Sequence, residues 1–206
     1  MCGRYVVTNP VSKTNKIVKS AIQIEDTENY NAHPYQNLPV IKKYINGNTL
    51  EKLKWGLVPN WSKKKDFKAL INARLETIDE KISFKKLIKL HRCVAVADGF
   101  YEWKREEKNK TPYYFIREDK KNMYMAGIYE NDEFCLITEN ASGKVNIIHH
   151  RQPVILNESD VNRYLNLELS GSNFLNECKK TSLIFYEVSK EVNKPTNNSI
   201  SLIQQI

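Results

Sequence analysis

The sequence lacks long hydrophobic runs and paired cysteines, and each absence excludes a class of protein. No apolar stretch in the 206 residues approaches the roughly 18 residues that a membrane-spanning helix needs. The four cysteines are widely spaced and form no CxxC pair, which argues against a disulfide framework and against a zinc cluster. No secretory signal, internal repeat, low-complexity tract or linker is evident. We therefore expect a cytoplasmic protein with one domain over residues 1–206.

The charge balance is positive. Lys and Arg number 32 against 24 Asp and Glu, which gives a formal net charge of +8. A charge of this sign suits a polyanionic partner such as nucleic acid, although many lysine-rich proteins bind nothing anionic. Charge alone therefore leaves nucleic-acid binding open.

Short apolar segments separated by turns predict a β-rich chain with a few helices. Asn46-Gly47-Asn48 is typical of a hairpin turn. Strands are expected at residues 4–8, 38–45, 49–58, 93–97, 100–104, 112–117, 123–130, 133–138, 154–156 and 182–188. Helices are expected at 10–24, 79–90, 159–167 and 171–179, with irregular chain at 26–37 and a loop at 105–111. The prediction is an α+β fold with a mostly antiparallel, curved and barrel-like β core and peripheral helices.

Cys2 directly follows Met1, and a small side chain at this position lets Met1 be removed. The chain would then begin with a thiol and a free α-amine on one Cα. An α-amine titrates near ~8 and a lysine near ~10.4, so the α-amine is far more often unprotonated near neutral pH. The amine could form a Schiff base with an aldehyde, and the thiol could then close a thiazolidine ring. The alternative is that Cys2 serves only N-terminal processing.

Glu102 and His149 are candidates for proton transfer. Glu102 follows the apolar run of residues 94–97 and lies among aromatic residues. Such surroundings tend to raise the pKa of a carboxyl, unless Glu102 faces solvent on an edge strand. His149 and His150 should point in opposite directions on extended chain, so a shared metal is not expected. One of them could carry protons, and the alternative is a buried, hydrogen-bonded histidine.

Two further segments could bind a polyanion. Arg74 can grip a phosphate with two hydrogen bonds and Asn72 can orient an amine or a carbonyl, unless Arg74 merely forms a surface pair with Glu76. Trp61 stands beside the basic run Lys63–Lys65. Aromatic rings next to cations suit single-stranded nucleic acid, because bases stack on the rings and cations follow the phosphates. The alternative is a tryptophan of the hydrophobic core.

Several motifs occur together in order along most of the chain. They are Met1–Tyr5, Asn31-Ala32 with Pro34, Pro39-Val40, Trp55–Pro59, Asn72–Thr77, Arg92-Cys93, Asp98–Trp103, Thr138 with Ala141, and Ile148–Pro153. Their joint occurrence in this order resembles the SRAP family (SOS-response-associated peptidase), whose members shield abasic sites in DNA.

The resemblance implies that the protein itself removes Met1 and that Cys2 then attacks the ring-opened aldehyde of an abasic site in single-stranded DNA. It also implies that Glu102 and His149 handle protons, and that Asn72 holds the sugar or the Cys2 amine. No metal or other cofactor is expected, and the protein should be a monomer that joins the nucleoid when it binds DNA. The residues expected to contact DNA are Arg4, Arg74, Trp61, Asn31 and Pro39.

Three alternatives stay open at this point. The first is a cysteine peptidase that acts on other proteins through Cys2 and His149. The second is a module that binds single-stranded nucleic acid without covalent chemistry. The third is a lyase that cleaves the strand by β-elimination through a Schiff base at the Cys2 amine.

Overall fold

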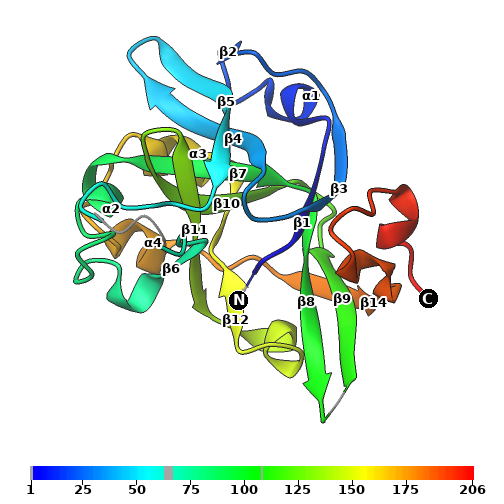
Figure 1. Cartoon of the computed structure of the whole chain (residues 1–206). Helices are drawn as coiled ribbons and strands as arrows, with labels where there is room; N and C mark the ends of the chain where they lie inside the picture. The colour runs from blue at the N-terminus through cyan, green and yellow to red at the C-terminus, as the bar shows by residue number, and fades with distance from the viewer. Residues whose placement is uncertain (1, 63–66, 108) are drawn as a thin grey trace.

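The computed structural model describes residues 2–62, 67–107 and 109–206, and over these ranges the strands form two sheets (Figure 1). The smaller sheet has the order β14 (Leu183–Glu187), β9 (Asn109–Arg117), β8 (Gly99–Glu106), β1 (Tyr5–Thr8) and β3 (Glu28–Ala32). The larger has the order β12 (Arg151–Pro153), β11 (Glu133–Asn140), β10 (Met123–Glu130), β7 (Arg92–Ala97), β4 (Asn37–Tyr44), β5 (Gly47–Trp55) and β2 (Ser20–Ala21).

Two short strands lie off this path. β13 (Ile155–Leu156) pairs with β10, and β6 (Asn72–Arg74) pairs with β11. β11 runs parallel to β5 and β6, and β2 runs parallel to β5, while the other pairings are antiparallel. The predicted α+β class with a mostly antiparallel core is therefore confirmed.

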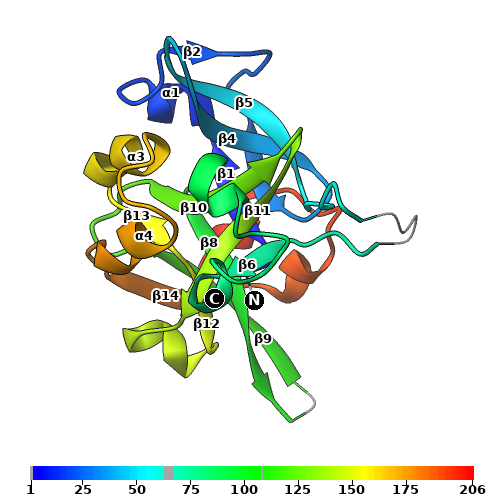
Figure 2. The same ribbon diagram turned by 90° about the vertical axis from the view of Figure 1, so that its left-hand side faces the viewer.

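The larger sheet is buried on both faces, which explains its long apolar strands. Along β7, Cys93 and Ala95 pack into one hydrophobic cluster and Val94 and Val96 into another. The first cluster lies between the two sheets and includes Phe100 of the smaller one. The second is covered by α2 (Leu87–Leu90), α3 (Glu158–Leu165) and α4 (Asn173–Glu177), which lie on the outer side of the sheet (Figure 2).

The hairpin predicted around Asn46-Gly47 is confirmed, with Tyr44 opposite Gly47 across the turn. Gly47 has a φ of 128°, a conformation that favours glycine. The predicted strand 49–58 ends early, at Trp55, where Gly56 has a φ of 137°. Within the described residues, no helix has the length and apolar character to cross a membrane.

Two predicted helices prove much shorter than expected. The helix 10–24 is only α1 (Pro10–Thr14), because the backbone of Ser20-Ala21 pairs with β5 instead of continuing the helix. The carboxylate of Asp26, and not Asn9, accepts hydrogen bonds from backbone N–H groups at the start of α1. The helix 79–90 is reduced to α2, preceded by turns.

Two segments expected to be irregular contain strands. Residues 26–37 include β3, which pairs with β1. The loop predicted at 105–111 is instead the far end of a hairpin, because β8 continues to Glu106 and β9 begins at Asn109. This hairpin extends away from the rest of the molecule (Figure 1). The polar chain after β14 forms the 3₁₀ helices η3 (Lys190–Asn193) and η4 (Ile200–Ile203).

Candidate active site at the N-terminus

The pairing of β1 with β8 places the start of the chain beside the aromatic segment of β8. Tyr5 lies opposite Phe100, and the backbone N–H of Tyr101 donates to the carbonyl of Arg4 at 2.9 Å. If the same antiparallel register is extended by two residues, Gly3 comes opposite Glu102, so the N-terminus lies alongside this residue. Local pairing of two strands therefore brings Cys2 and Glu102 together from positions 100 residues apart.

Cys2 is fully buried in the cluster between the two sheets. Its carbonyl accepts a hydrogen bond from Nδ2 of Asn72 at 2.9 Å. Burial raises the pKa of the Cys2 thiol well above its usual range, and the charge of Glu102 acts in the same direction. With Met1 still in the sequence, the thiol is thus held protonated and is a weak nucleophile.

Asn72 reaches Cys2 from β6, which the parallel pairing with β11 fixes at the edge of the larger sheet. While its Nδ2 holds the Cys2 carbonyl, no donor among the described residues reaches its buried Oδ1. A buried amide oxygen without a hydrogen bond lowers the stability of the fold. It is therefore suited to accept a hydrogen bond from an incoming group.

Glu102 and His149 form the second half of the site. Glu102 is 3% exposed on β8, and His149 follows the 3₁₀ helix η2 (Gly143–Ile147). Nδ1 of His149 lies 3.9 Å from Oε1 of Glu102. Burial raises the pKa of Glu102 to about 7 and lowers the pKa of His149 to about 4. At neutral pH the imidazole is therefore uncharged, and the two groups do not form an ion pair.

The backbone of Arg151 holds the ring of His149 in place. Nδ1 of His149 lies 3.0 Å from the backbone nitrogen and 3.1 Å from the carbonyl oxygen of Arg151. Nδ1 accepts from the N–H when it carries no proton, and donates to the carbonyl oxygen when it carries one. The ring is also stacked on His150, with centroids 4.5 Å apart, so the expectation that the two side chains point in opposite directions is wrong, because this segment is not an extended strand. Glu102 can give or take a proton near neutral pH, and His149 offers a neutral partner beside it.

A pocket of about 370 Å³ opens above Glu102 and His149. Three cationic side chains stand in its wall, together with Trp103, whose Nε1 donates to Oδ1 of Asn193 at 2.7 Å. The lining residues are Gly3, Arg4, Glu102, Trp103, Arg105, Lys110, His149 and Asn193. The pocket thus combines a buried proton-transfer pair with a positive rim suited to an anionic ligand.

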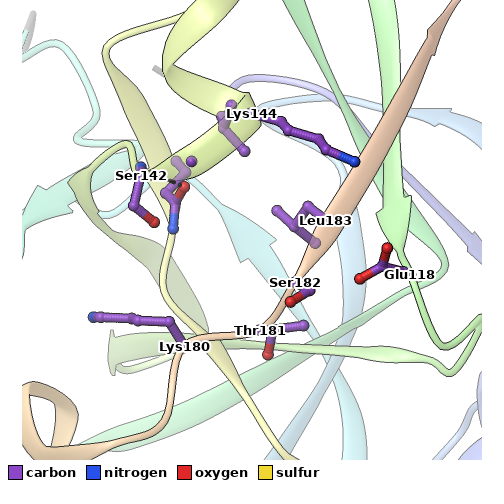
Figure 3. Close-up of a pocket in the computed structure, with 10 residues that line it drawn as sticks. Glu118, Ser142, Lys144, Lys180, Thr181, Ser182 and Leu183 are labelled. Atoms are coloured by element: carbon purple, nitrogen blue, oxygen red, sulfur yellow. Dashed lines mark hydrogen bonds between the residues drawn. The ribbon is translucent and has the colours of Figure 1, made fainter.

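A second cavity, also of about 370 Å³, is lined in part by η2 and shares no lining residue with the first (Figure 3). Its wall is formed by η2, Glu118 and the segment 180–183 that leads into β14. Lys144 and Lys180 stand in this wall with Glu118, but it holds neither cysteine nor histidine. The candidate chemistry therefore belongs to the pocket beside Cys2.

The predicted DNA contacts Arg4 and Asn31 are bound to each other. Nη1 of Arg4 donates to Oδ1 of Asn31 at 2.7 Å and to the carbonyl of Val192 at 2.8 Å. Nδ2 of the buried Asn31 donates in turn to the carbonyls of Lys194 and Asn197. Arg4 lines the pocket, whereas Asn31 anchors it to the C-terminal segment.

The other predicted DNA contacts lie apart from the pocket wall. Arg74 is exposed at the end of β6, and within the described part of the chain it forms no ion pair. Trp61 is 50% exposed and meets Phe67 edge to face, while the basic run Lys63–Lys65 lies outside the described residues. Pro39 is buried in the middle of β4. DNA binding by these residues stays a prediction.

The alternative pairing of Arg74 with Glu76 is wrong. Both oxygens of Glu76 are bound by Arg151, at 2.7 and 2.9 Å. Arg151 is 4% exposed and also donates to Oδ1 of Asn140 and to the carbonyl of Thr138. This ion pair joins β12 to the segment that follows β6. It thereby links the chain next to His149 with the chain next to Asn72.

Sequence reasoning missed Arg105, Lys110 and Asn193 as pocket residues. Arg105 and Lys110 fell in the predicted loop, and only recognition of a longer hairpin could have paired them. Asn193 lies in the polar tail, where no sequence signal marks it. Throughout the described ranges, no group of three or more His, Cys, Asp or Glu side chains could hold a metal ion.

The fold and the site together define a protein with a buried thiol at position 2, beside a positively charged pocket that contains a buried carboxyl–imidazole pair. The family described as SOS response associated peptidase (SRAP) matches residues 1–195. The chain belongs to this family.

Similar proteins span the whole chain. The abasic site processing protein YoqW of Bacillus subtilis (strain 168) is 34% identical, with 99% of both chains covered. The abasic site processing protein YedK of Escherichia coli (strain K12) is 27% identical, with 100% of both covered. A crystal structure of a protein from Bacteroides thetaiotaomicron shares the fold, with a TM-score of 0.84 at 24% identity and 100% of both chains covered.

Proposed function

We propose that this protein processes abasic sites in single-stranded DNA by joining its N-terminal Cys2 covalently to the aldehyde of the lesion. The observation that carries the proposal is the convergence of Cys2, Asn72, Glu102 and His149 beside one cationic pocket. The names of the relatives YoqW and YedK, both abasic site processing proteins, support the same substrate.

Removal of Met1 comes first, because the α-amine of Cys2 is otherwise held in a peptide bond. We attribute this cleavage to the protein itself, which is the peptidase activity that the family description suggests. Cleavage frees an amine of which about half is unprotonated near pH 8. The processed chain then carries an amine and a thiol on the same Cα.

The first step on DNA opens the sugar. An abasic site is an aldehyde masked as a cyclic hemiacetal, so opening it needs a proton on the ring oxygen and removal of the proton from the C1′ hydroxyl. Protonated Glu102 supplies the first proton, and neutral His149 accepts the second. A carboxyl that titrates near pH 7 suits this task, because both of its protonation states are populated.

The amine and the thiol of Cys2 then add in turn to the same carbon. The amine attacks the C1′ aldehyde and forms a carbinolamine. Glu102, which regains a proton from the His149 imidazolium, protonates the carbinolamine hydroxyl, which leaves as water, and then takes the N–H proton so that a neutral C=N bond remains. The thiol adds to the resulting C=N bond, and its proton passes to the nitrogen as the thiazolidine ring closes. One water is released overall, and Oδ1 of Asn72 can accept a hydrogen bond from the amine.

Binding of the strand relies on positive charge and stacking. We propose that Arg4 and Arg74 contact phosphates beside the lesion and that the exposed ring of Trp61 stacks on a base. The protein acts as a monomer with a single SRAP domain over residues 1–206, in the cytoplasm and at the nucleoid. Strand cleavage by β-elimination from the Schiff base is a side reaction that ring closure suppresses.

A denaturing gel shift with single-stranded DNA that contains one abasic site tests the proposal. Processed wild type should give a heat-stable shifted band, while Cys2→Ala and a form that retains Met1 should give none. Cleaved DNA without a shifted band would favour the lyase. Cleavage of unrelated proteins with no DNA adduct would favour the peptidase, and salt-sensitive binding alone would favour a non-covalent module.

A further inference from the structure

The hairpin of β8 and β9 ends in a two-stranded arm, defined as residues 103–106 and 109–112, that leaves the body of the molecule (Figure 1). Its register pairs Trp103 with Pro112, Lys104 with Thr111, and Arg105 with Lys110. Directly opposite residues in an antiparallel pair share a face, and neighbours along a strand alternate between faces. Arg105 and Lys110 therefore share one face, and Lys104 belongs to the other.

The cations on the two faces of the arm differ in whether they form ion pairs. Lys104 forms an ion pair with Glu106, with 2.5 Å between Nζ and Oε1. Arg105 and Lys110 are exposed, and in the part of the chain that the structure describes neither has a carboxylate within ion-pair distance. Lys110 does lie over the ring of Trp103, with its Nζ 5.4 Å from the ring centroid. One face of the arm thus offers two cations without counter-charges.

This face borders the pocket. Arg105 and Lys110 line it together with Glu102 and His149. Their charges act on these groups: beyond the effect of burial, Arg105 helps to lower the pKa of His149, and Lys110 opposes the rise in the pKa of Glu102. Arg4, the third cation of the pocket, is already bound by Asn31 and by the carbonyl of Val192.

We propose that Arg105 and Lys110 form a phosphodiester-binding site, and that the arm holds the DNA backbone next to the abasic nucleotide in the pocket. The inference rests on the proposed function and adds a second contact surface to it. Arg74, at the end of β6, binds the strand on one side of the lesion, and the arm binds it on the other. A strand held on both sides presents the lesion to Cys2 in a fixed orientation.

The test measures binding without covalent chemistry, by fluorescence anisotropy on single-stranded DNA that carries a tetrahydrofuran abasic analogue with no aldehyde. The Arg105→Ala/Lys110→Ala variant should bind about tenfold more weakly. The slope of log affinity against log salt should fall by about 1.4, at about 0.7 per lost phosphate contact. The matched control is Lys104→Ala/Lys121→Ala, which removes the same charge from the other face and from an exposed turn; it should change affinity less than about twofold.

Methylphosphonate substitution locates the contact. Neutralising one phosphate near the lesion should weaken wild-type binding, and the Arg105→Ala/Lys110→Ala variant should have lost this sensitivity at that phosphate. Equal losses for the variant and the control would overturn the proposal, as would unchanged affinity of the variant. Wild type that binds the analogue but fails to crosslink abasic DNA would contradict the proposed function and would still allow the arm to be tested.

Discussion

Two carboxylates, Glu102 and Glu76, lie close to the same short segment and behave in opposite ways. Glu76 is bound by Arg151 through two hydrogen bonds, which hold its pKa below its usual range although partial burial acts against this. Glu102 has the uncharged His149 as its neighbour, and burial raises its pKa to about 7. His149 and Arg151 are only two residues apart in the chain.

The partner therefore decides what a partly buried carboxyl can do. A guanidinium keeps its charge at any accessible pH, so Glu76 stays ionised and serves to hold β12 against the segment after β6. An imidazole can itself be neutral, so Glu102 can exchange its proton near physiological pH. The Glu76–Arg151 pair fixes the site, and the Glu102–His149 pair is the one to which we assign its chemistry.

The strongest test of this contrast is the substitution Glu102→Gln. We expect the crosslinking rate at saturating abasic DNA to fall by about 10²- to 10⁴-fold, because the amide cannot transfer a proton. Thermal unfolding should show no loss of stability, since the amide is uncharged and similar in shape. Crosslinking at the wild-type rate would contradict the role given to Glu102.

Arg151→Met should instead act on stability. It removes one partner of a buried pair and leaves Glu76 without its cation, so the free energy of unfolding should fall by about 2–3 kcal/mol. This is below the value for fully buried pairs because the Glu76 side chain is 38% exposed. The backbone N–H of residue 151 still reaches His149, so the saturating rate should change by less than about tenfold. Urea unfolding and single-turnover crosslinking give the two numbers.

The double variant Glu76→Gln/Arg151→Met is the control for that prediction. It removes both charges, so it should recover part of the stability that Arg151→Met loses. No recovery would mean that Arg151 acts mainly through Asn140 and Thr138 and not through Glu76.

The two carboxylates should also differ in their pH dependence. The pKa of Glu102 is raised on folding, so its contribution to stability is complete below about pH 4.3 and is lost as the pH rises through about 7. Glu102→Gln should therefore gain about 2 kcal/mol relative to wild type between pH 5 and 8. The pKa of Glu76 is lowered, so Glu76→Gln should approach wild type only as the pH falls below about 4. Chemical denaturation at a series of pH values measures both trends.

The smallest effect is expected at His149. Burial lowers its pKa to about 4, so its ring should remain neutral from pH 8 down to about 5. Imidazole ¹⁵N shifts report the protonation state of the ring directly. A His149 titration near pH 6.5 would mean that the pair is charged when the enzyme works.

The sequence was most informative where a signal is local. The β4–β5 hairpin follows from a turn sequence between two apolar segments, and it formed as predicted. The helix expected at 10–24 shows the opposite case, because the pairing of Ser20-Ala21 with β5 is a tertiary contact that outweighs local periodicity. The same applies to the arm, where strand pairing orders a segment whose polar composition predicts a loop.

The residues of the candidate site also differ in whether a local sequence signal identifies them. Cys2, Glu102 and His149 were identified from residue chemistry and motif order, and the structure places them near one pocket. The partner of Glu76 was misjudged because Arg151 is 75 residues away, whereas Arg74 is only two residues away in sequence. Arg105 and Lys110 were missed because their position at the pocket depends on how far the hairpin extends. Contacts between segments that are distant in sequence can be identified only once the fold is known.

The measurement that tests the central claim most directly is the intact mass of the adduct formed with abasic single-stranded DNA in the absence of a reductant. The account predicts a mass equal to protein without Met1 plus DNA minus one water, with the DNA on the N-terminal peptide after digestion. Cys2→Ala should give no adduct of this stability. An adduct on another residue, or one of equal yield from a chain that retains Met1, would contradict the account.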